Sequence, residues 1–82
     1  MVLHIGGGYF VDTSNVLGIF DLETLSPGSP SLDFLRAREE GGEITDATQA
    51  GIPKSFIVCP STVYLCEMSV STLRKRLAGG EL

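Results

Sequence analysis

Residues 54–68, with the sequence KSFIVCPSTVYLCEM, decide the fold. Two runs rich in β-branched and aromatic residues, 54–59 and 63–68, flank the short turn sequence Pro60-Ser61-Thr62, and this pattern predicts an antiparallel β-hairpin. We place Cys59 opposite Val63, so that each pair further from the turn follows in the same register. Ile57 then lies opposite Leu65 and Val58 opposite Tyr64.

This register gives the hairpin two apolar faces. One face carries Ile57, Cys59, Val63 and Leu65, and the other carries Phe56, Val58, Tyr64, Cys66 and Met68. The two cysteines lie on opposite faces, which excludes an intramolecular disulfide between them. If one face packs on helices, the other leaves an apolar patch that a monomer does not normally expose. We therefore expect a homo-oligomer, and the predicted interface consists of Phe20, Phe56, Val58, Tyr64 and Cys66.

Further strands are predicted on both sides of a helix in the first half of the chain. Residues 2–5 and 9–11 form a hairpin through Gly6-Gly7-Gly8, and residues 43–48 form a short strand. Residues 16–22 form a strand that is apolar on both faces. Such a strand is either central in its sheet or has a second face that meets another subunit.

Two helices complete the expected fold. The first runs from Pro30 to Glu40, because Ser29 is an N-cap residue, proline suits the first helical position and Gly41-Gly42 ends the pattern. Its inner side carries Leu32 and Leu35, with Phe34 as a further candidate, and its outer side carries Arg36, Arg38, Glu39 and Glu40. The second helix covers residues 69–80, with an inner stripe of Val70, Leu73 and Leu77 and Gly79 as a natural stop. The sequence predicts an α+β fold, a small mixed or antiparallel sheet with two helices.

Length and charge limit the classes of function. Eighty-two residues allow a single domain, 1–82, because a second core would have too little chain to bury it. Six Lys and Arg against ten Asp and Glu give a net charge of −4, the wrong sign for a protein that coats nucleic acid through its overall charge. A phosphate contact would need a local patch, and Arg74-Lys75-Arg76 is the only cationic cluster. These three residues either contact phosphate or complement the dipole at the end of their helix.

The sequence contains no constellation that indicates catalysis or a metal. His4 is the only histidine, and the spacing of Cys59 and Cys66 fits no zinc motif, so we read both cysteines as small, half-buried thiols. The acidic residues Asp12, Asp21, Asp46 and Glu67 lie mainly at strand ends and turns, where capping explains them. We expect no enzyme, cofactor, metal or small-molecule substrate. No apolar run reaches the roughly 18–20 residues that span a bilayer, and no signal peptide begins the chain, so we expect a cytoplasmic protein without a membrane partner.

Four short segments, found in one order, resemble the RemA/RemB family of small bacterial regulators of the extracellular matrix. They are LGIFD at 17–21, FL at 34–35, PKS at 53–55 and STLRKRL at 71–77, and the likeness covers about residues 2–78. The resemblance implies a fold similar to LytTR-type DNA-binding domains, assembly into rings, and DNA-binding control of biofilm-matrix genes.

The chain departs from one branch of that family in the loop that follows residues 46–48. That branch has paired arginines that resemble DNA contacts, whereas this chain has Gly51 and Ile52, and Asn15 stands where the branch tends to have another arginine. The predicted phosphate contacts to double-stranded DNA are therefore Lys54, Arg74, Lys75 and Arg76. A ring would repeat this thin patch and gain avidity. The alternative is an oligomeric protein-interaction scaffold without DNA affinity of its own.

Overall fold

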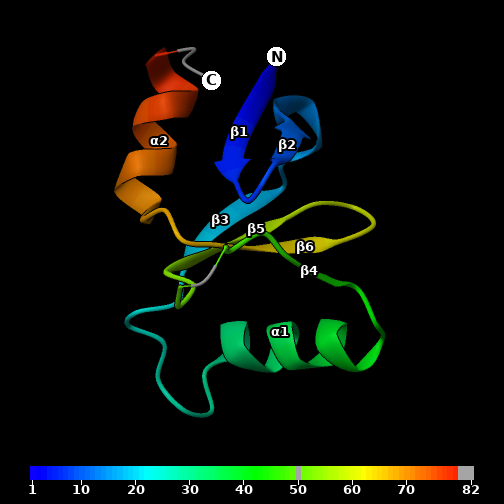
Figure 1. Cartoon of the computed structure of the whole chain (residues 1–82). Coiled ribbons are helices and arrows are strands. Elements are labelled where there is room, and N and C mark those ends of the chain that lie inside the picture. Colours follow the sequence, from blue (N-terminus) through cyan, green and yellow to red (C-terminus); the bar gives the residue numbers. More distant parts are fainter. Residues whose placement is uncertain (50, 80–82) are drawn as a thin grey trace.

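The computed structural model describes residues 1–49 and 51–79, which form an α+β fold with two sheets and two α-helices (Figure 1). The strands are β1 (Val2–Gly6), β2 (Tyr9–Asp12), β3 (Gly18–Asp21), β4 (Ile44–Asp46), β5 (Ser55–Val58) and β6 (Val63–Cys66). The helices are α1 (Pro30–Glu40) and α2 (Val70–Gly79), and a single 3-10 turn covers Thr13–Asn15. The predicted fold class, the two hairpins and the two helices are confirmed. Gly80, the last residue of the predicted second helix, lies outside the described residues.

The strands divide into two sheets rather than one. Strands β1 and β2 pair with each other, and the other four form a mixed sheet in the order β3-β5-β6-β4, in which β4 runs parallel to β6. In Figure 1, α1 lies on one side of the four-stranded sheet, while α2 and the β1–β2 hairpin lie on the other side. The hairpin therefore acts as a covering layer, because its buried side chains Leu3, Ile5 and Val11 pack onto the sheet.

Each face of the four-stranded sheet has its own apolar cluster. On the α2 side, Ile57, Cys59 and Cys66 pack with the hairpin and with Leu73 of α2. On the α1 side, Phe56, Val58 and Val63 form the buried cluster, and Leu35 of α1 and Ile44 of β4 are among the partly buried residues packed against it. Both faces of the central hairpin are thus covered within one chain, which corrects the expectation that one of them stays free.

The predicted register of the β5–β6 hairpin is wrong by one residue. Val58 pairs with Val63 and Ile57 with Tyr64, so that the tight bend contains Pro60 and Ser61. The Cys59 N–H donates to the Thr62 carbonyl over 3.0 Å and closes this bend. Because side chains alternate along a strand, a shift of one residue moves every side chain of β6 to the other face relative to β5. Both cysteines consequently lie on the same face, where they are buried free thiols.

Arg38 contacts this bend and is itself a second correction. Its Nη2 donates to the Cys59 carbonyl over 3.4 Å, and its Nε forms a 3.1 Å ion pair with Glu43. The guanidinium also lies over the Phe34 ring, 5.5 Å from the ring centroid. Arg38 was expected on the outer side of the helix, but its stem reaches inward and satisfies a carbonyl at the hairpin bend. A long side chain can bury its stem in this way while its charge stays paired.

Strand β3 is an edge strand, which rules out the first of the two alternatives for its apolar faces, a central strand. It pairs with β5 alone, with Phe20 opposite Phe56 and Ile19 opposite Ile57. Ile19 packs toward the α2 side, whereas Phe20 stacks on Phe56 with ring centroids 5.1 Å apart and remains 42% exposed. The two-sided apolar pattern therefore marks a strand whose α1 side is incompletely covered by its own chain.

Candidate nucleic-acid interface

Two of the three cationic side chains on α2 face solvent. Leu73 is completely buried against the β1–β2 hairpin, and Leu77 packs on the same cluster. Successive helical residues are about 100° apart, so Arg74 and Lys75 point away from the buried stripe defined by Leu73. Both are exposed. Arg74 and Lys75 are therefore the cations of α2 that an anion outside the molecule can reach.

Arg76 has a different environment from its two neighbours. Its Nη1 donates to the main-chain carbonyl of His4 in β1 over 3.3 Å, and the residue is only partly exposed. The ring of His4 in turn stacks on Phe10, with centroids 4.7 Å apart. Arg76 therefore fastens α2 to the N-terminal hairpin, a role that the sequence did not suggest.

Lys54 is the last residue of the loop between β4 and β5, residues 47–54. Its side chain is exposed, and its N–H donates to the Cys66 carbonyl over 2.8 Å. The next residue, Ser55, donates its hydroxyl to the Met68 carbonyl over 2.7 Å. Lys54 is thus held beside the segment that leads from β6 into α2, and Figure 1 shows this loop and the first turn of α2 at the same end of the sheet.

The loop that precedes Lys54 is ordered by acidic side chains. Asp46 Oδ1 accepts hydrogen bonds from the Thr48 N–H and hydroxyl, and these bonds hold the pKa of the Asp46 carboxyl below its usual value. Glu67 Oε1 accepts from the N–H groups of Gln49 and Gly51 over 2.6 and 3.0 Å. Asp12 and Asp21 bind their own turns in the same manner as Asp46, which confirms capping for these three aspartates. Glu67 reaches a different segment of the chain.

Three of the five predicted interface residues have little surface to offer a partner. Phe56, Val58 and Cys66 are buried in the interior of the chain, and Tyr64 is partly buried in an edge contact with Tyr9. Phe20 alone among the five is exposed. The register shift divides these residues, because Phe56 and Val58 lie on the α1 side of the sheet, whereas Tyr64 and Cys66 lie on the side covered by the N-terminal hairpin.

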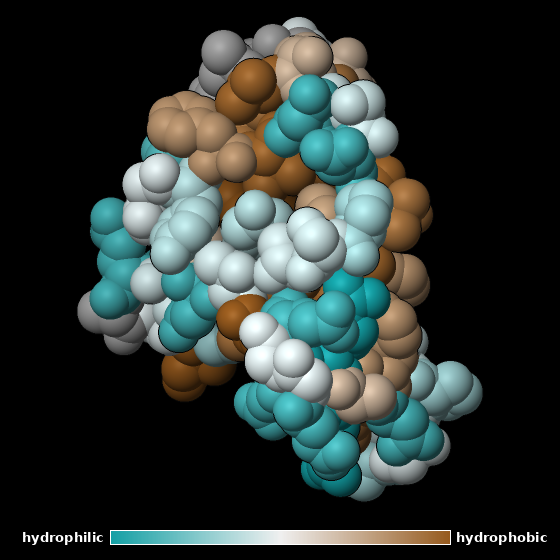
Figure 2. Space-filling view, turned by 90° about the vertical axis from the view of Figure 1, so that its right-hand side faces the viewer, coloured by the Kyte–Doolittle hydropathy of each residue, from teal (hydrophilic) through white to brown (hydrophobic). Residues whose placement is uncertain are grey.

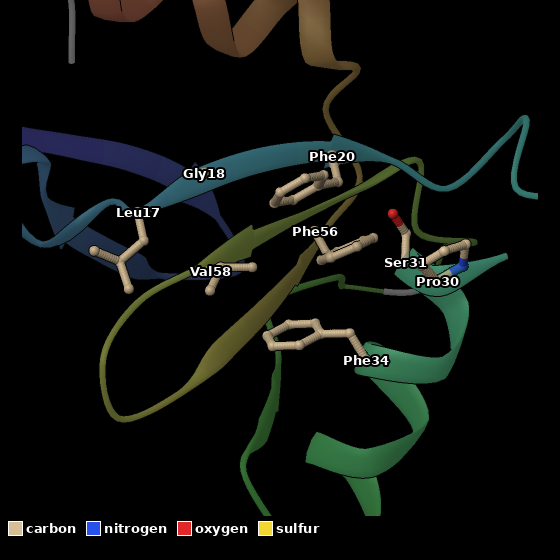
Figure 3. A pocket seen from close by; sticks show the side chains of 8 residues that line it. All are labelled: Leu17, Gly18, Phe20, Pro30, Ser31, Phe34, Phe56 and Val58. Atoms are coloured by element: carbon tan, nitrogen blue, oxygen red, sulfur yellow. The ribbon is translucent and has the colours of Figure 1, made fainter.

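Phe20 instead borders an apolar groove between β3 and the start of α1 (Figure 3). The groove has a volume of about 330 Å³, and Phe56 and Val58 form part of its wall. Leu17 and Phe34 stand at its rim with 68% and 38% of their surfaces exposed. In Figure 3 the rings of Phe20, Phe56 and Phe34 follow one another from β3 to α1. Sequence patterns did not assign Leu17 or Phe34 to an interface, although both belong to the segments on which the family resemblance rests.

A second exposed apolar area lies on the N-terminal hairpin, where Val2, Tyr9 and Phe10 keep much of their surface. Figure 2 shows hydrophobic side chains gathered in the upper part of one side of the molecule, and mainly hydrophilic ones in the lower part, over the α1 end. Among residues 1–49 and 51–79, no helix is both long and apolar enough to cross a membrane. The same residues contain no cluster of three or more His, Cys, Asp or Glu that could hold a metal ion.

Comparison with known proteins identifies the family. Residues 2–77 match the RemA-like family, described as extracellular matrix regulatory protein A-like. The chain is also 30% identical over 76 residues to extracellular matrix regulatory protein B of Bacillus subtilis (strain 168), and the match covers 93% of this chain and 89% of that protein. The family description is thus that of a regulatory protein. Because the match runs from β1 almost to the end of α2, and so includes both the cationic helix and the apolar groove, this chain belongs to the RemA-like family.

Proposed function

We propose that this protein is an oligomeric DNA-binding transcriptional regulator of extracellular-matrix genes. The observation that carries the proposal is the match to extracellular matrix regulatory protein B over 93% of the chain, together with the RemA-like family match. The names of that relative and of the family indicate regulation of the extracellular matrix. Control of genes by DNA binding would place the protein in the cytoplasm of a bacterium.

Exposed cations support contact with the DNA backbone. Arg74 and Lys75 project from α2, and Lys54 lies at the same end of the sheet as the start of that helix. Phosphate contacts contribute affinity without reading sequence, and each releases condensed counterions. One protomer with a net charge of −4 would bind weakly. A ring of protomers, as the family resemblance implies together with a LytTR-like fold, would repeat the patch and raise the avidity.

The test is binding of the purified protein to a mixed-sequence duplex, measured by fluorescence anisotropy at about 50 and 200 mM salt. Arg74→Glu with Lys75→Glu should abolish binding at the higher salt and leave the solution mass unchanged. Arg36→Glu is the control for the single variant Arg74→Glu, because each reverses the charge of one exposed arginine, Arg36 on α1 and Arg74 on α2. It makes the same kind of charge reversal on the opposite side of the sheet and should alter binding far less.

The alternative function is an oligomeric protein-interaction scaffold without DNA affinity. The acidic net charge favours it, as does the use of Arg76 for an internal contact with His4. This alternative would be established if the wild-type protein has an oligomeric mass and does not bind the duplex at about 50 mM salt. Equal weakening by the α1 and α2 charge reversals would also contradict the assigned phosphate contacts.

A second copy of the chain is the proposed occupant of the apolar groove. Strand β3 has one free edge, and an edge strand with exposed apolar neighbours is a template for pairing with another chain. In an antiparallel ladder, alternate backbone groups point away from the partner strand. The Leu22 N–H bonds to the Lys54 carbonyl, so the N–H groups of Ile19 and Asp21 point to the free edge. Another protomer could extend the sheet there and cover Phe20.

Phe20→Asp tests this interface, because a charge placed in an apolar interface must be desolvated without a partner. Light scattering should show monomers for Phe20→Asp and the wild-type mass for Ile52→Asp. Ile52 is the control because its side chain is also apolar and is 86% exposed, but it lies in the β4–β5 loop, away from the groove. A wild-type mass for Phe20→Asp would show that copies associate elsewhere, for example through the hairpin residues Tyr9 and Phe10.

A further inference from the structure

We propose that the apolar groove of one copy binds the outer face of the β1–β2 hairpin of a second copy, so that copies associate head to tail, an inference that rests on the proposed association through the groove. Among residues 1–49 and 51–79, every large apolar side chain that is exposed, except Ile52, belongs either to the segment 1–12 or to the groove. Each of these two areas is therefore apolar surface that one chain leaves uncovered.

The outer face of the hairpin presents an aromatic ring that is held in place. The buried side chains of the hairpin pack onto the sheet, so the alternate ones, Val2, His4 and Phe10, point away from it. Phe10 pairs with His4 across the hairpin, and the two rings stack with centroids 4.7 Å apart. The Phe10 side chain nevertheless remains 59% exposed. A partner can therefore bind this ring without first ordering it.

The groove is suited to receive such a ring. It has a volume of about 330 Å³, and the rings of Phe20, Phe34 and Phe56 form much of its lining (Figure 3). Aromatic rings pack favourably against one another in offset or edge-to-face arrangements. Two grooves that faced each other would leave a void, and the side chains around a void lose their packing contacts. A ring from outside fills the same space.

The two areas face in opposite directions, and this determines the kind of contact. The groove lies on the α1 side of the four-stranded sheet, whereas the hairpin covers the α2 side (Figure 1). A contact between identical surfaces of two copies would cover two grooves or two hairpins and leave the other pair exposed. A head-to-tail contact covers one area of each kind, and further copies can cover the remaining two.

The charges beside the two areas also favour a contact between unlike surfaces. Carboxylates flank the groove, because Asp21 ends β3 and Asp33 lies in the first turn of α1. Beside the hairpin, the guanidinium of Arg76 is held at the His4 carbonyl, and the one carboxylate of the hairpin, Asp12, binds its own turn. Groove against groove would bring carboxylates together, whereas groove against hairpin brings them toward a cation. The contact uses neither of the two cations assigned to DNA phosphates.

The experiment mixes two full-length variants that each lack one of the two areas. Phe20→Asp disables the groove, and Phe10→Asp disables the hairpin, because a charge in an apolar contact must be desolvated without a partner. Light scattering should give the monomer mass for each variant alone. An equimolar mixture should give twice the monomer mass and nothing larger, because the intact groove of one variant binds the intact hairpin of the other.

Two further samples make the result independent of folding and of added charge. Leu17→Asp and Val2→Asp form a second pair, one in each area, at residues that are 68% and 44% exposed and so contribute little to the core. Their mixture should also give twice the monomer mass. Phe20→Asp mixed with the double variant Phe10→Asp, Phe20→Asp should stay monomeric, because neither copy then has an intact groove.

The outcomes separate this contact from the proposed function. If the wild-type protein is oligomeric and both mixtures stay monomeric, the head-to-tail contact is overturned and contact between like surfaces takes its place. The wild-type mass for Phe10→Asp alone also overturns it. A monomeric wild-type protein overturns the oligomeric part of the proposed function and this contact with it. Mixed dimers from a protein that binds no DNA would support the head-to-tail contact and contradict only the DNA binding.

Discussion

Helices α1 and α2 have 11 and 10 residues, but they cover the two faces of the same sheet to different extents. None of the residues of α1 is buried, whereas α2 buries Leu73 completely. The α2 side is closed further by the β1–β2 hairpin, and Arg76 ties the helix to that hairpin. The α1 side keeps an open groove of about 330 Å³ with Phe20 and Phe34 at its edge. One face of the sheet is therefore closed by its own chain, and the other keeps exposed apolar surface around the groove.

The difference has a local origin in how each helix is specified. Helix α1 is defined at its ends: the Ser29 hydroxyl accepts from the Leu32 N–H over 3.2 Å, Pro30 begins the helix and Gly41 ends it. Such caps stop and start a helix but do not determine how tightly it packs. Helix α2 owes its place to the apolar stripe of Leu73 and Leu77. A helix positioned by its stripe should tolerate core substitutions less well than a helix positioned by its caps.

Truncation of a leucine on each helix gives the largest expected effect. Leu73→Ala removes a completely buried side chain and should lower the free energy of unfolding by about 2–5 kcal/mol. Leu35→Ala removes a partly exposed side chain from the α1 side and should cost about 1 kcal/mol, because less apolar surface loses its cover. Urea denaturation of both variants measures the two losses. Equal losses would contradict the view that only the α2 side is closed by its own chain.

The next largest effect is expected where the N-terminal turn meets the sheet. Gly7 has φ +59°, and a Cβ there would collide with the Ala47 carbonyl, whereas Gly8 has φ +79° and open space around it. Gly8→Ala should cost only the backbone strain of a left-handed residue, about 1–2 kcal/mol. Gly7→Ala should cost more, because the hairpin must also move off the β4–β5 loop. Similar stabilities of the two variants in urea would show that the hairpin does not rest tightly on Ala47.

Elements whose signals are local were predictable from the sequence, and relations between distant segments were not. The bounds of α1 follow from Ser29, Pro30 and Gly41, and these predictions are confirmed. In the observed register of β5 and β6, the Cys59 carbonyl accepts a hydrogen bond from Arg38, which is 21 residues away in sequence. No pattern within residues 54–68 carries that information. The one-residue error in register placed Tyr64 and Cys66 on the same face as Phe56 and Val58, whereas the two pairs lie on opposite faces of the sheet.

The candidate site also contains features that were predictable from the sequence and features that were not. Exposure of Arg74 and Lys75 follows from helical periodicity and the apolar stripe, so the sequence was sufficient. The engagement of Arg76 with the His4 carbonyl joins residues 72 positions apart, and the contact of Glu67 with Gln49 joins residues 18 apart. An acidic residue after a strand was read as a cap because capping is a local explanation. Only the folded chain shows that Glu67 binds another loop.

The smallest expected effect concerns the thiols on the closed side of the sheet. Cys66 is fully buried, and its Sγ donates to the Ile5 carbonyl over 3.2 Å, so the thiol contributes as the protonated form. Burial raises the pKa of both Cys66 and Cys59 above the usual value of 9.0. A group whose pKa is raised by folding stabilises the folded state fully below its unfolded pKa. That stabilisation is lost as the pH rises above 9.0 toward the folded value.

We therefore expect the free energy of unfolding to fall above pH 9.0 by a larger amount in wild type than in a Cys59→Ala, Cys66→Ala variant. The variant is needed as a control because other groups also titrate in alkaline solution, and only the difference between the two curves reports the thiols. In native protein at pH 8, a thiol reagent should label neither cysteine, since both are buried and protonated. Rapid labelling of Cys66 without unfolding would mean that the β1–β2 hairpin opens from the sheet. The α2 side would then be the more mobile of the two faces, the reverse of what the packing of Leu73 and Ile5 indicates.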